Sequence, residues 1–188
     1  MSGSALWYLS RATGVVTVVL LTIVVCLGVI TAGRRRPTGE SATIVMGLHR
    51  WLSLGMLVFL GIHIVTAILD GYVSISWLAV LVPFTSGYDT LLVGLGTIAL
   101  DLLVVVMVTS YLRHRIPERR WRFVHGASYA MWVVALFHGF LMGTADQPGL
   151  RVVTLTCAAV GGLMACWRVV ATHSDKERRH AIDAQEWS

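Results

Sequence analysis

Four histidines lie inside long apolar segments of this 188-residue chain, and their spacing groups them into two pairs. His49 and His63 are fourteen residues apart, and His125 and His138 are thirteen apart. Imidazole nitrogens are common metal ligands, and a histidine inside a membrane helix is costly unless its ring nitrogens are satisfied. The pattern therefore predicts metal-ligating positions, arranged as two pairs on two helices.

The composition is that of an integral membrane protein. Apolar residues (AVILMFWYC) make up 56% of the chain and charged residues only 13%. A helix needs about 20 apolar residues to cross a hydrocarbon layer of about 30 Å, and five stretches are long enough. These stretches cover residues 8–32, 45–69, 90–112, 123–143 and 150–171. We therefore predict an all-α membrane domain of five helices over residues 1–173 and a polar cytoplasmic tail over 174–188.

Basic residues flank alternate ends of these helices, which predicts the orientation of the chain. Thirteen of the fifteen Lys and Arg residues lie after the first helix, after the third helix or at the end of the chain, and only Arg11 and Arg151 lie on the other side. Because basic flanks stay in the cytoplasm, the N-terminus is predicted outside and the C-terminus inside a cell membrane. The net charge of +5 thus reports topology and lipid contact. It does not indicate nucleic-acid binding.

The two histidine-bearing helices are separated by a single crossing, so they run in the same direction. His49 and His125 then lie toward the inner, basic end, and His63 and His138 lie toward the outer half. Fourteen helical residues span about 21 Å and thirteen about 20 Å, so each histidine has a partner at its own depth. Two imidazoles fill both axial positions of a haem iron, which suits electron transfer. We therefore predict a bundle that encloses two stacked haems.

The angular separation of two histidines around one helix supports His49 and His63 better than His125 and His138. At 100° per residue, fourteen residues return to within about 40° of the starting face, as His49 and His63 require. Thirteen residues leave His125 and His138 about 140° apart on a straight helix. Either the helix over 123–143 is locally tightened or widened, or one of its histidines is not a ligand.

The runs HRWLSLGMLVFLGIH and HGASYAMWVVALFHG resemble the two haem-bearing helices of the ferric reductase-like transmembrane domain. NADPH oxidases, ferric reductases and the bacterial YedZ/MsrQ-type haem subunits share this domain. The resemblance covers nearly all five helices, and the oxidases have the same fourteen and thirteen spacing. It implies that His49 and His125 hold an inner haem b and that His63 and His138 hold an outer one.

Three arginines are further candidates. By the same resemblance, Arg11 would lie beside the outer haem, where it would meet a propionate or the electron acceptor; the alternative is an ordinary interfacial anchor. Arg50 and Arg122 are adjacent to the inner end of the histidine-bearing helices. They could pair with propionates of the inner haem, or they could only set the topology.

Several residues lie between the two histidine levels or beside them. Met56, Met131 and Trp132 are midway along their helices and could fill the space between the haems, although simple core packing would select the same side chains. Asp101 lies near the middle of the helix over 90–112, where it could relay protons or form a structural hydrogen bond. The apolar stretch over 71–89 is too short to span, and we expect it to form an interfacial or re-entrant element that caps the outer haem.

The chain also departs from the family pattern. The sequence contains no GxGxxG motif and no phosphate loop, so we expect this chain to have no soluble domain for FAD and a nicotinamide nucleotide. The position at which the oxidases carry an extra histidine is Ala67, so superoxide production is not expected. A separate flavin reductase or a quinol would then donate electrons to this chain, and a redox partner on the extracytoplasmic side would accept them.

The main hypothesis is thus transmembrane electron transfer through two bis-histidine haems b. Two alternatives stay open: a cytochrome b anchor that oxidises quinol for a partner, and a transporter whose histidines bind a metal ion or move protons. The sequence leaves open whether the chain is itself an enzyme, because the chemical step could belong to a partner.

Overall fold

The computed structural model describes residues 3–32, 37–71, 73, 75–143 and 147–186, with side chains described within residues 5–170. The described part of the chain is helical and contains no β-strand. Its five long helices are α1 (Gly3–Thr31), α2 (Gly39–Leu69), α4 (Thr90–Tyr111), α5 (Glu118–Leu141) and α6 (Pro148–Glu186). Each contains a stretch that is long and apolar enough to cross a membrane. The predicted five-helix membrane fold is confirmed.

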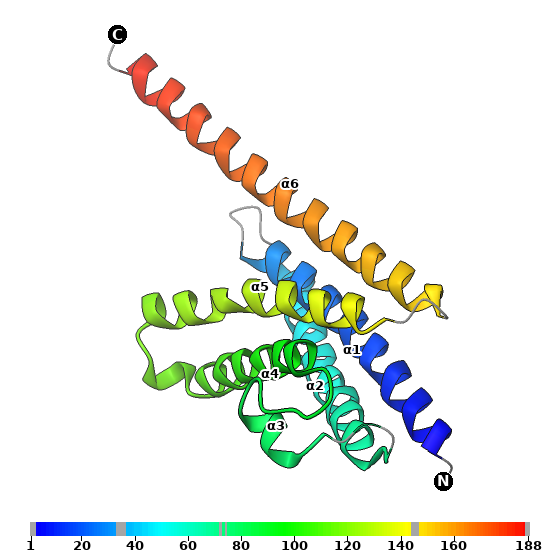
Figure 1. The fold of residues 1–188 in the computed structure, drawn as a ribbon. Helices are drawn as coiled ribbons and strands as arrows, with labels where there is room; N and C mark the ends of the chain where they lie inside the picture. Colours follow the sequence, from blue (N-terminus) through cyan, green and yellow to red (C-terminus); the bar gives the residue numbers. More distant parts are fainter. Residues whose placement is uncertain (1–2, 33–36, 72, 74, 144–146, 187–188) are drawn as a thin grey trace.

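The helices form two packed pairs. α1 runs along α2, and α4 runs along α5, while the two pairs meet chiefly where α1 contacts α5. α6 packs on α1 and α5, and its C-terminal part extends beyond the other helices (Figure 1). The helical backbone continues through residues 174–186, the stretch expected to form a separate tail. α1 is therefore the central helix, with contacts to α2, α5 and α6.

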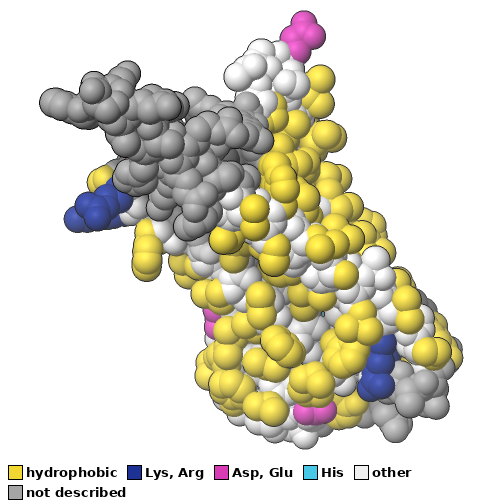
Figure 2. Space-filling view, turned by 90° about the horizontal axis from the view of Figure 1, so that it is seen from above, with side chains coloured by type: hydrophobic (Ala, Val, Ile, Leu, Met, Phe, Trp, Pro, Cys, Tyr) yellow, Lys and Arg dark blue, Asp and Glu magenta, His cyan; other side chains and the backbone are white. Residues whose placement is uncertain are grey.

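The core is a cluster of apolar side chains between the helices. It is made of Leu21, Val25, Met56, Leu103, Met131, Trp132, Leu136 and Cys157. The indole nitrogen of Trp132 donates a hydrogen bond to Thr22 Oγ1 at 3.0 Å, so its only polar group is satisfied. The outer surface is apolar as well, since Val58, Leu163 and Val169 are all more than 60% exposed. Hydrophobic side chains cover most of the described surface in Figure 2. Such an exterior is typical of a protein surrounded by lipid.

The connection between α2 and α4 contains a short helix, α3 (Trp77–Leu81). Ser76 caps its first turn by accepting a hydrogen bond from the Ala79 amide at 3.3 Å. Thr97 on α4 donates to the Ala79 carbonyl oxygen at 2.6 Å and so fixes α3 against α4. Phe84 follows with φ of +64° and lies against Gly94, where no Cβ would fit. The connection thus packs on one end of α4. That residues 71–89 form an interfacial or re-entrant element capping a haem stays a prediction.

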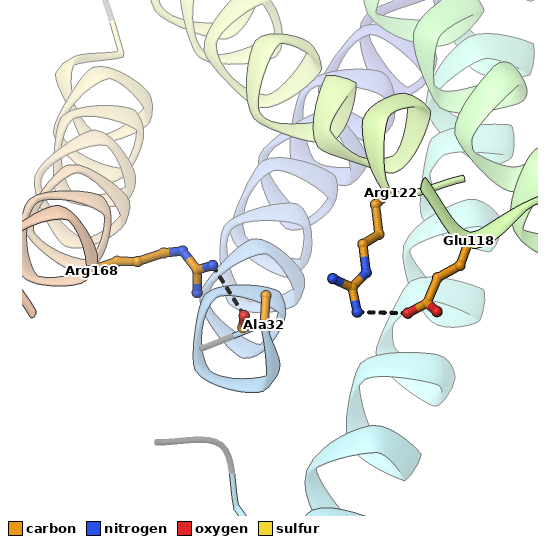
Figure 3. Close-up of polar contacts among 4 residues, drawn as sticks. All are labelled: Ala32, Glu118, Arg122 and Arg168. Atoms are coloured by element: carbon orange, nitrogen blue, oxygen red, sulfur yellow. Dashed lines mark hydrogen bonds and ion pairs between the residues drawn. The ribbon is translucent and has the colours of Figure 1, made fainter. Parts of the chain in front are cut away.

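An arginine of α6 binds the C-terminal end of α1. The Arg168 guanidinium on α6 donates to the carbonyl oxygens of Val29 at 3.0 Å and of Ala32 at 3.1 Å, at the C-terminal end of α1. Figure 3 shows the bond to Ala32. The last carbonyls of a helix lack partners within the helix and carry partial negative charge, so a cation stabilises them. A single side chain therefore joins α6 to the end of α1.

Candidate functional site

The four histidines meet in two pairs between the helix pairs. The ring centroids of His49 on α2 and His125 on α5 are 6.3 Å apart, with an angle of 52° between the rings. The centroids of His63 on α2 and His138 on α5 are 6.4 Å apart, with an angle of 77°. The structure thus brings together the same partners that the sequence grouped by depth.

Hydrogen bonds to backbone carbonyl oxygens fix the orientation of three of the four rings. The Nδ1 atom of His49 lies 3.1 Å from the Val24 carbonyl oxygen. The Nδ1 atom of His63 lies 2.8 Å from the Ser10 carbonyl oxygen, and that of His138 lies 2.7 Å from the Leu92 carbonyl oxygen. A carbonyl oxygen can only accept, so each Nδ1 carries the proton and donates it. This tautomer leaves the lone pair on Nε2, the arrangement usual for a histidine that binds a metal through Nε2.

His125 is held differently. Its Nδ1 lies 3.3 Å from the Ser110 hydroxyl, and its ring stacks on the indole of Trp121, with 4.9 Å between centroids and 25° between planes. The guanidinium of Arg113, in the short helix η1 (Arg113–Arg115), lies over the Trp121 ring at 4.3 Å. Sequence reasoning missed Trp121, although its position one helical turn before His125 was a usable signal.

The partners of the histidines on the neighbouring helices are spaced differently. On α1, the carbonyls of Ser10 and Val24 are fourteen residues apart, which matches His49 and His63 on antiparallel α2. On α4, Leu92 contributes a backbone oxygen to His138 and Ser110 contributes a hydroxyl to His125. Both histidines of α5 thus contact α4, although they are thirteen residues apart. α5 is α-helical from Glu118 to Leu141, without a 3₁₀ or π segment.

Glycines lie against three of the four rings. A Cβ atom on Gly14 would come within 2.9 Å of the His63 ring, and one on Gly96 within 2.9 Å of the His138 ring. A Cβ on Gly28 would lie 3.7 Å from the His49 ring, an ordinary contact distance. At the His63 and His138 level, α1 and α4 can therefore approach the rings only because these positions carry no side chain.

A cavity of about 250 Å³ opens between the helix pairs at the level of His63 and His138. It is lined by all the long helices and by the connection that contains α3, and it extends along the bundle to Met56 and Met131. Both methionines are buried, at 2% and 4% exposure, and Trp132 lies beside them in the core. The three side chains expected between the histidine levels are thus buried together there.

Comparison with known proteins identifies the family of the chain. The family model described as the ferric reductase like transmembrane component matches residues 13–136, about two thirds of the chain. The chain belongs to the ferric reductase-like transmembrane family. The match includes His49, His63 and His125 and ends two residues before His138. No curated protein and no solved structure matches the chain.

Membership in the ferric reductase-like family indicates transmembrane electron transfer, and haem is a common cofactor of the family. Among the described residues, no group of three or more His, Cys, Asp or Glu side chains is placed to hold a metal ion. Each histidine pair instead offers two ligands, the number that a six-coordinate haem iron takes from the protein. An imidazole nitrogen binds a transition metal at about 2 Å. When two imidazoles bind one metal from opposite sides, their ring centroids are therefore about 6.4 Å apart. The observed separations fit this value.

The three candidate arginines of this ferric reductase-like chain lie in different surroundings. Arg11 is half-buried, packs over the Trp7 ring at 4.5 Å and lines the cavity together with His63 and His138. Arg50 is exposed. Arg122 is also exposed and forms an ion pair with Glu118 at 2.6 Å, one turn earlier on α5 (Figure 3). Of the three, only Arg11 lies at the cavity.

Asp101 lies on an exposed part of α4. It is not among the residues that line the cavity. Within the described part of the chain, its carboxylate forms no hydrogen bond with a histidine or with a threonine of α6, the partners that the sequence suggested. The structure gives no support to a proton relay through Asp101.

Proposed function

We propose that this chain carries electrons across a cell membrane through two haems b. His49 and His125 bind the iron of one haem, and His63 and His138 bind the iron of the other. The observation that carries the proposal is the facing of two ring pairs at 6.3 and 6.4 Å, with Nδ1 of three rings held by carbonyl oxygens. The rings are thereby oriented before a metal binds, which lowers the cost of binding.

When bound, haem iron supplies a centre that takes up and releases single electrons. The protein's contribution is to hold the ligands and to keep water away from them. Two histidines on each iron leave no open coordination position, so little rearrangement accompanies a change of oxidation state. Met56, Met131 and Trp132 fill the core between the two levels with apolar, polarizable side chains. Such a site suits electron transfer better than reaction of a substrate at iron.

The proposed direction follows from the charges. With thirteen of fifteen basic residues on one side, the His49 and His125 level faces the cytoplasm and the His63 and His138 level faces outward. Electrons would enter from a separate flavin reductase or from quinol and leave to an extracytoplasmic acceptor. Arg11, at the cavity beside His63 and His138, supplies a positive charge for a propionate or for an anionic acceptor.

Electron transfer across vesicles tests the proposal. The purified chain is placed in liposomes that contain trapped ferricyanide, and dithionite is added outside. We expect the ferricyanide to be reduced much faster than in empty vesicles, and a His63→Ala variant inserted to the same density should lose most of this rate. Reduction no faster than in empty vesicles, from a preparation shown to contain haem, would contradict the proposed function.

A further inference from the structure

Asp101 places a carboxyl group in the middle of a membrane helix, on a face that the described chain leaves uncovered. It is the only charged residue of α4 and lies near the centre of that helix. Its side chain is exposed and forms no hydrogen bond or ion pair within the described part of the chain. A carboxyl group at this depth is costly in hydrocarbon, and such residues almost always face other protein groups. Asp101 therefore indicates that a further protein segment covers this face.

Asp101 does not face the interior of the bundle. Leu103 and Val106 are buried in the core, and at 100° per residue they lie about 160° and 140° around α4 from Asp101. Leu103 also lines the cavity beside His63 and His138, whereas Asp101 does not. A ligand that fills this cavity would therefore leave Asp101 uncovered.

Asp101 belongs to a row of residues that runs the length of α4. The row advances in alternating steps of three and four residues and consists of Gly94, Thr97, Asp101, Val104, Val108 and Tyr111. This heptad spacing is typical of the contact line between two helices that cross at a shallow angle. The connection that contains α3 covers the first two members through Phe84 and Ala79. The row is thus a packing face, and its second half is the part that α3 does not reach.

The second half of the row is exposed and apolar apart from Asp101. Val104 and Val108 are 51% and 50% exposed, and Tyr111 is 83% exposed. Lipid tails are as apolar as valine, so valines alone give two membrane helices little reason to associate. A hydrogen bond between helices adds such a reason, and Asp101 supplies the polar group for it.

We propose that a second copy of this chain packs on the face formed by Asp101, Val104, Val108 and Tyr111, with α4 against α4. A twofold axis perpendicular to the membrane relates two copies in the same orientation and keeps every residue at its own depth. Asp101 then meets the same residue of the second copy. One carboxyl group in its protonated form donates to the other, so the face is complementary to itself.

The pattern of the row fits two parallel helices. β-branched residues in a heptad row favour pairs of parallel helices, and a single polar residue in such a row fixes the register and the number of helices. Asp101 and Val108 occupy equivalent positions of successive heptads. This inference goes beyond the proposed function and does not depend on it, since it follows from the face of α4 alone.

The test is energy transfer between donor-labelled and acceptor-labelled copies of the full chain in liposomes, measured as the chain is diluted with lipid. For the wild type, we expect transfer above that of randomly placed chains, with the dilution curve of a dimer. Asp101→Leu removes the hydrogen bond and should weaken the dimer by about threefold to thirtyfold. Asp101→Asn keeps a donor and an acceptor and should associate like the wild type. Thr156→Val removes an exposed hydroxyl from α6 and should change nothing.

Cysteine cross-linking locates the face. The three native cysteines are first replaced by alanine: Cys26, Cys157 and Cys166. In this background, Val104→Cys and Val108→Cys should form a disulfide-linked dimer when oxidised by copper phenanthroline in air. The matched control is Val58→Cys on α2, at a position that is 62% exposed but lies on another helix, and it should stay monomeric.

The outcomes that would overturn the proposal are distinct. A wild type that is monomeric at every density would overturn the dimer and leave the face to a different membrane protein. Undiminished association in Asp101→Leu, or its loss in Asp101→Asn, would overturn the shared hydrogen bond. Cross-linking of Val58→Cys as strong as that of Val104→Cys would overturn this face as the contact. Circular dichroism confirms that each variant keeps the helix content of the wild type.

Discussion

The two histidine levels of this molecule are built in different ways. At the His63 and His138 level, both rings are held by backbone carbonyl oxygens, and Gly14 and Gly96 let the neighbouring helices touch the rings. At the His49 and His125 level, one ring is held by a carbonyl oxygen, while His125 depends on a hydroxyl and an indole. One level is thus fixed mainly by backbone and the other partly by side chains.

This difference separates two kinds of constraint. Backbone carbonyls cannot be removed by substitution, so the orientation of His63 and His138 depends on how closely α1 and α4 approach α2 and α5. Side-chain partners can change one at a time, so the surroundings of His125 can be adjusted without moving a helix. We therefore expect the His63 and His138 level to be sensitive to added bulk and the His49 and His125 level to be sensitive to the loss of specific side chains.

Of the substitutions that test this comparison, alanine at Gly14 or Gly96 should have the largest effect on haem binding. A Cβ at Gly14 or Gly96 would lie 2.9 Å from a histidine ring, and overpacking of this kind costs about 1–3 kcal/mol. In Gly14→Ala or Gly96→Ala, the affinity for the outer haem should fall by about fivefold to more than a hundredfold. The measurement is haem content after purification, followed by titration with added haem.

The matched controls for the glycine variants are alanines at glycines near the ligands that have free space around them. Gly61 and Gly126 lie close to His63 and His125 in sequence, and a Cβ at either position would meet nothing within 4 Å. Gly28→Ala should also be tolerated, since its Cβ would make an ordinary contact with His49. If Gly61→Ala lost as much haem as Gly96→Ala, close packing on the ring would not be the cause.

Loss of one hydroxyl at the inner level should have a smaller effect. Ser110→Ala removes the hydrogen bond to His125 Nδ1, and a neutral hydrogen bond contributes about 0.5–1.5 kcal/mol. The affinity for the inner haem should therefore fall by about twofold to tenfold, and that for the outer haem should not change. The neighbouring Thr109→Ala removes a hydroxyl that bonds to the Val105 and Val106 carbonyls of α4 and should leave both affinities unchanged. Equal losses at both levels would show a general loosening of α4 instead.

The sequence predicted the helices well because membrane crossing is a local property of apolar length. It also placed His49 with His125 and His63 with His138, because charge and helical rise set the depth of each residue. It could not show that Ser110 contacts His125 or that Arg113 packs on the neighbouring Trp121 ring, since these contacts depend on how α4 and η1 pack on α5. The roles of Gly14 and Gly96 were hidden for the same reason.

The sequence also could not explain the thirteen-residue spacing of His125 and His138. A single straight helix would place His125 and His138 on different faces, and the sequence offered a local distortion as one explanation. In the structure α5 is α-helical from Glu118 to Leu141, and both of its histidines contact α4, His138 through the Leu92 carbonyl and His125 through the Ser110 hydroxyl. These contacts depend on how α4 packs on α5, and no pattern within α5 alone reports them.

The most direct test of the central claim is the haem content of the purified chain, expressed in cells that make haem. The reduced-minus-oxidised absorption spectrum is combined with a protein assay to give the number of haems per chain. We predict a b-type spectrum and two haems per chain, with about one lost in each of His63→Ala and His49→Ala. A colourless protein, or a haem content unchanged by both substitutions, would contradict the assignment of the two histidine pairs.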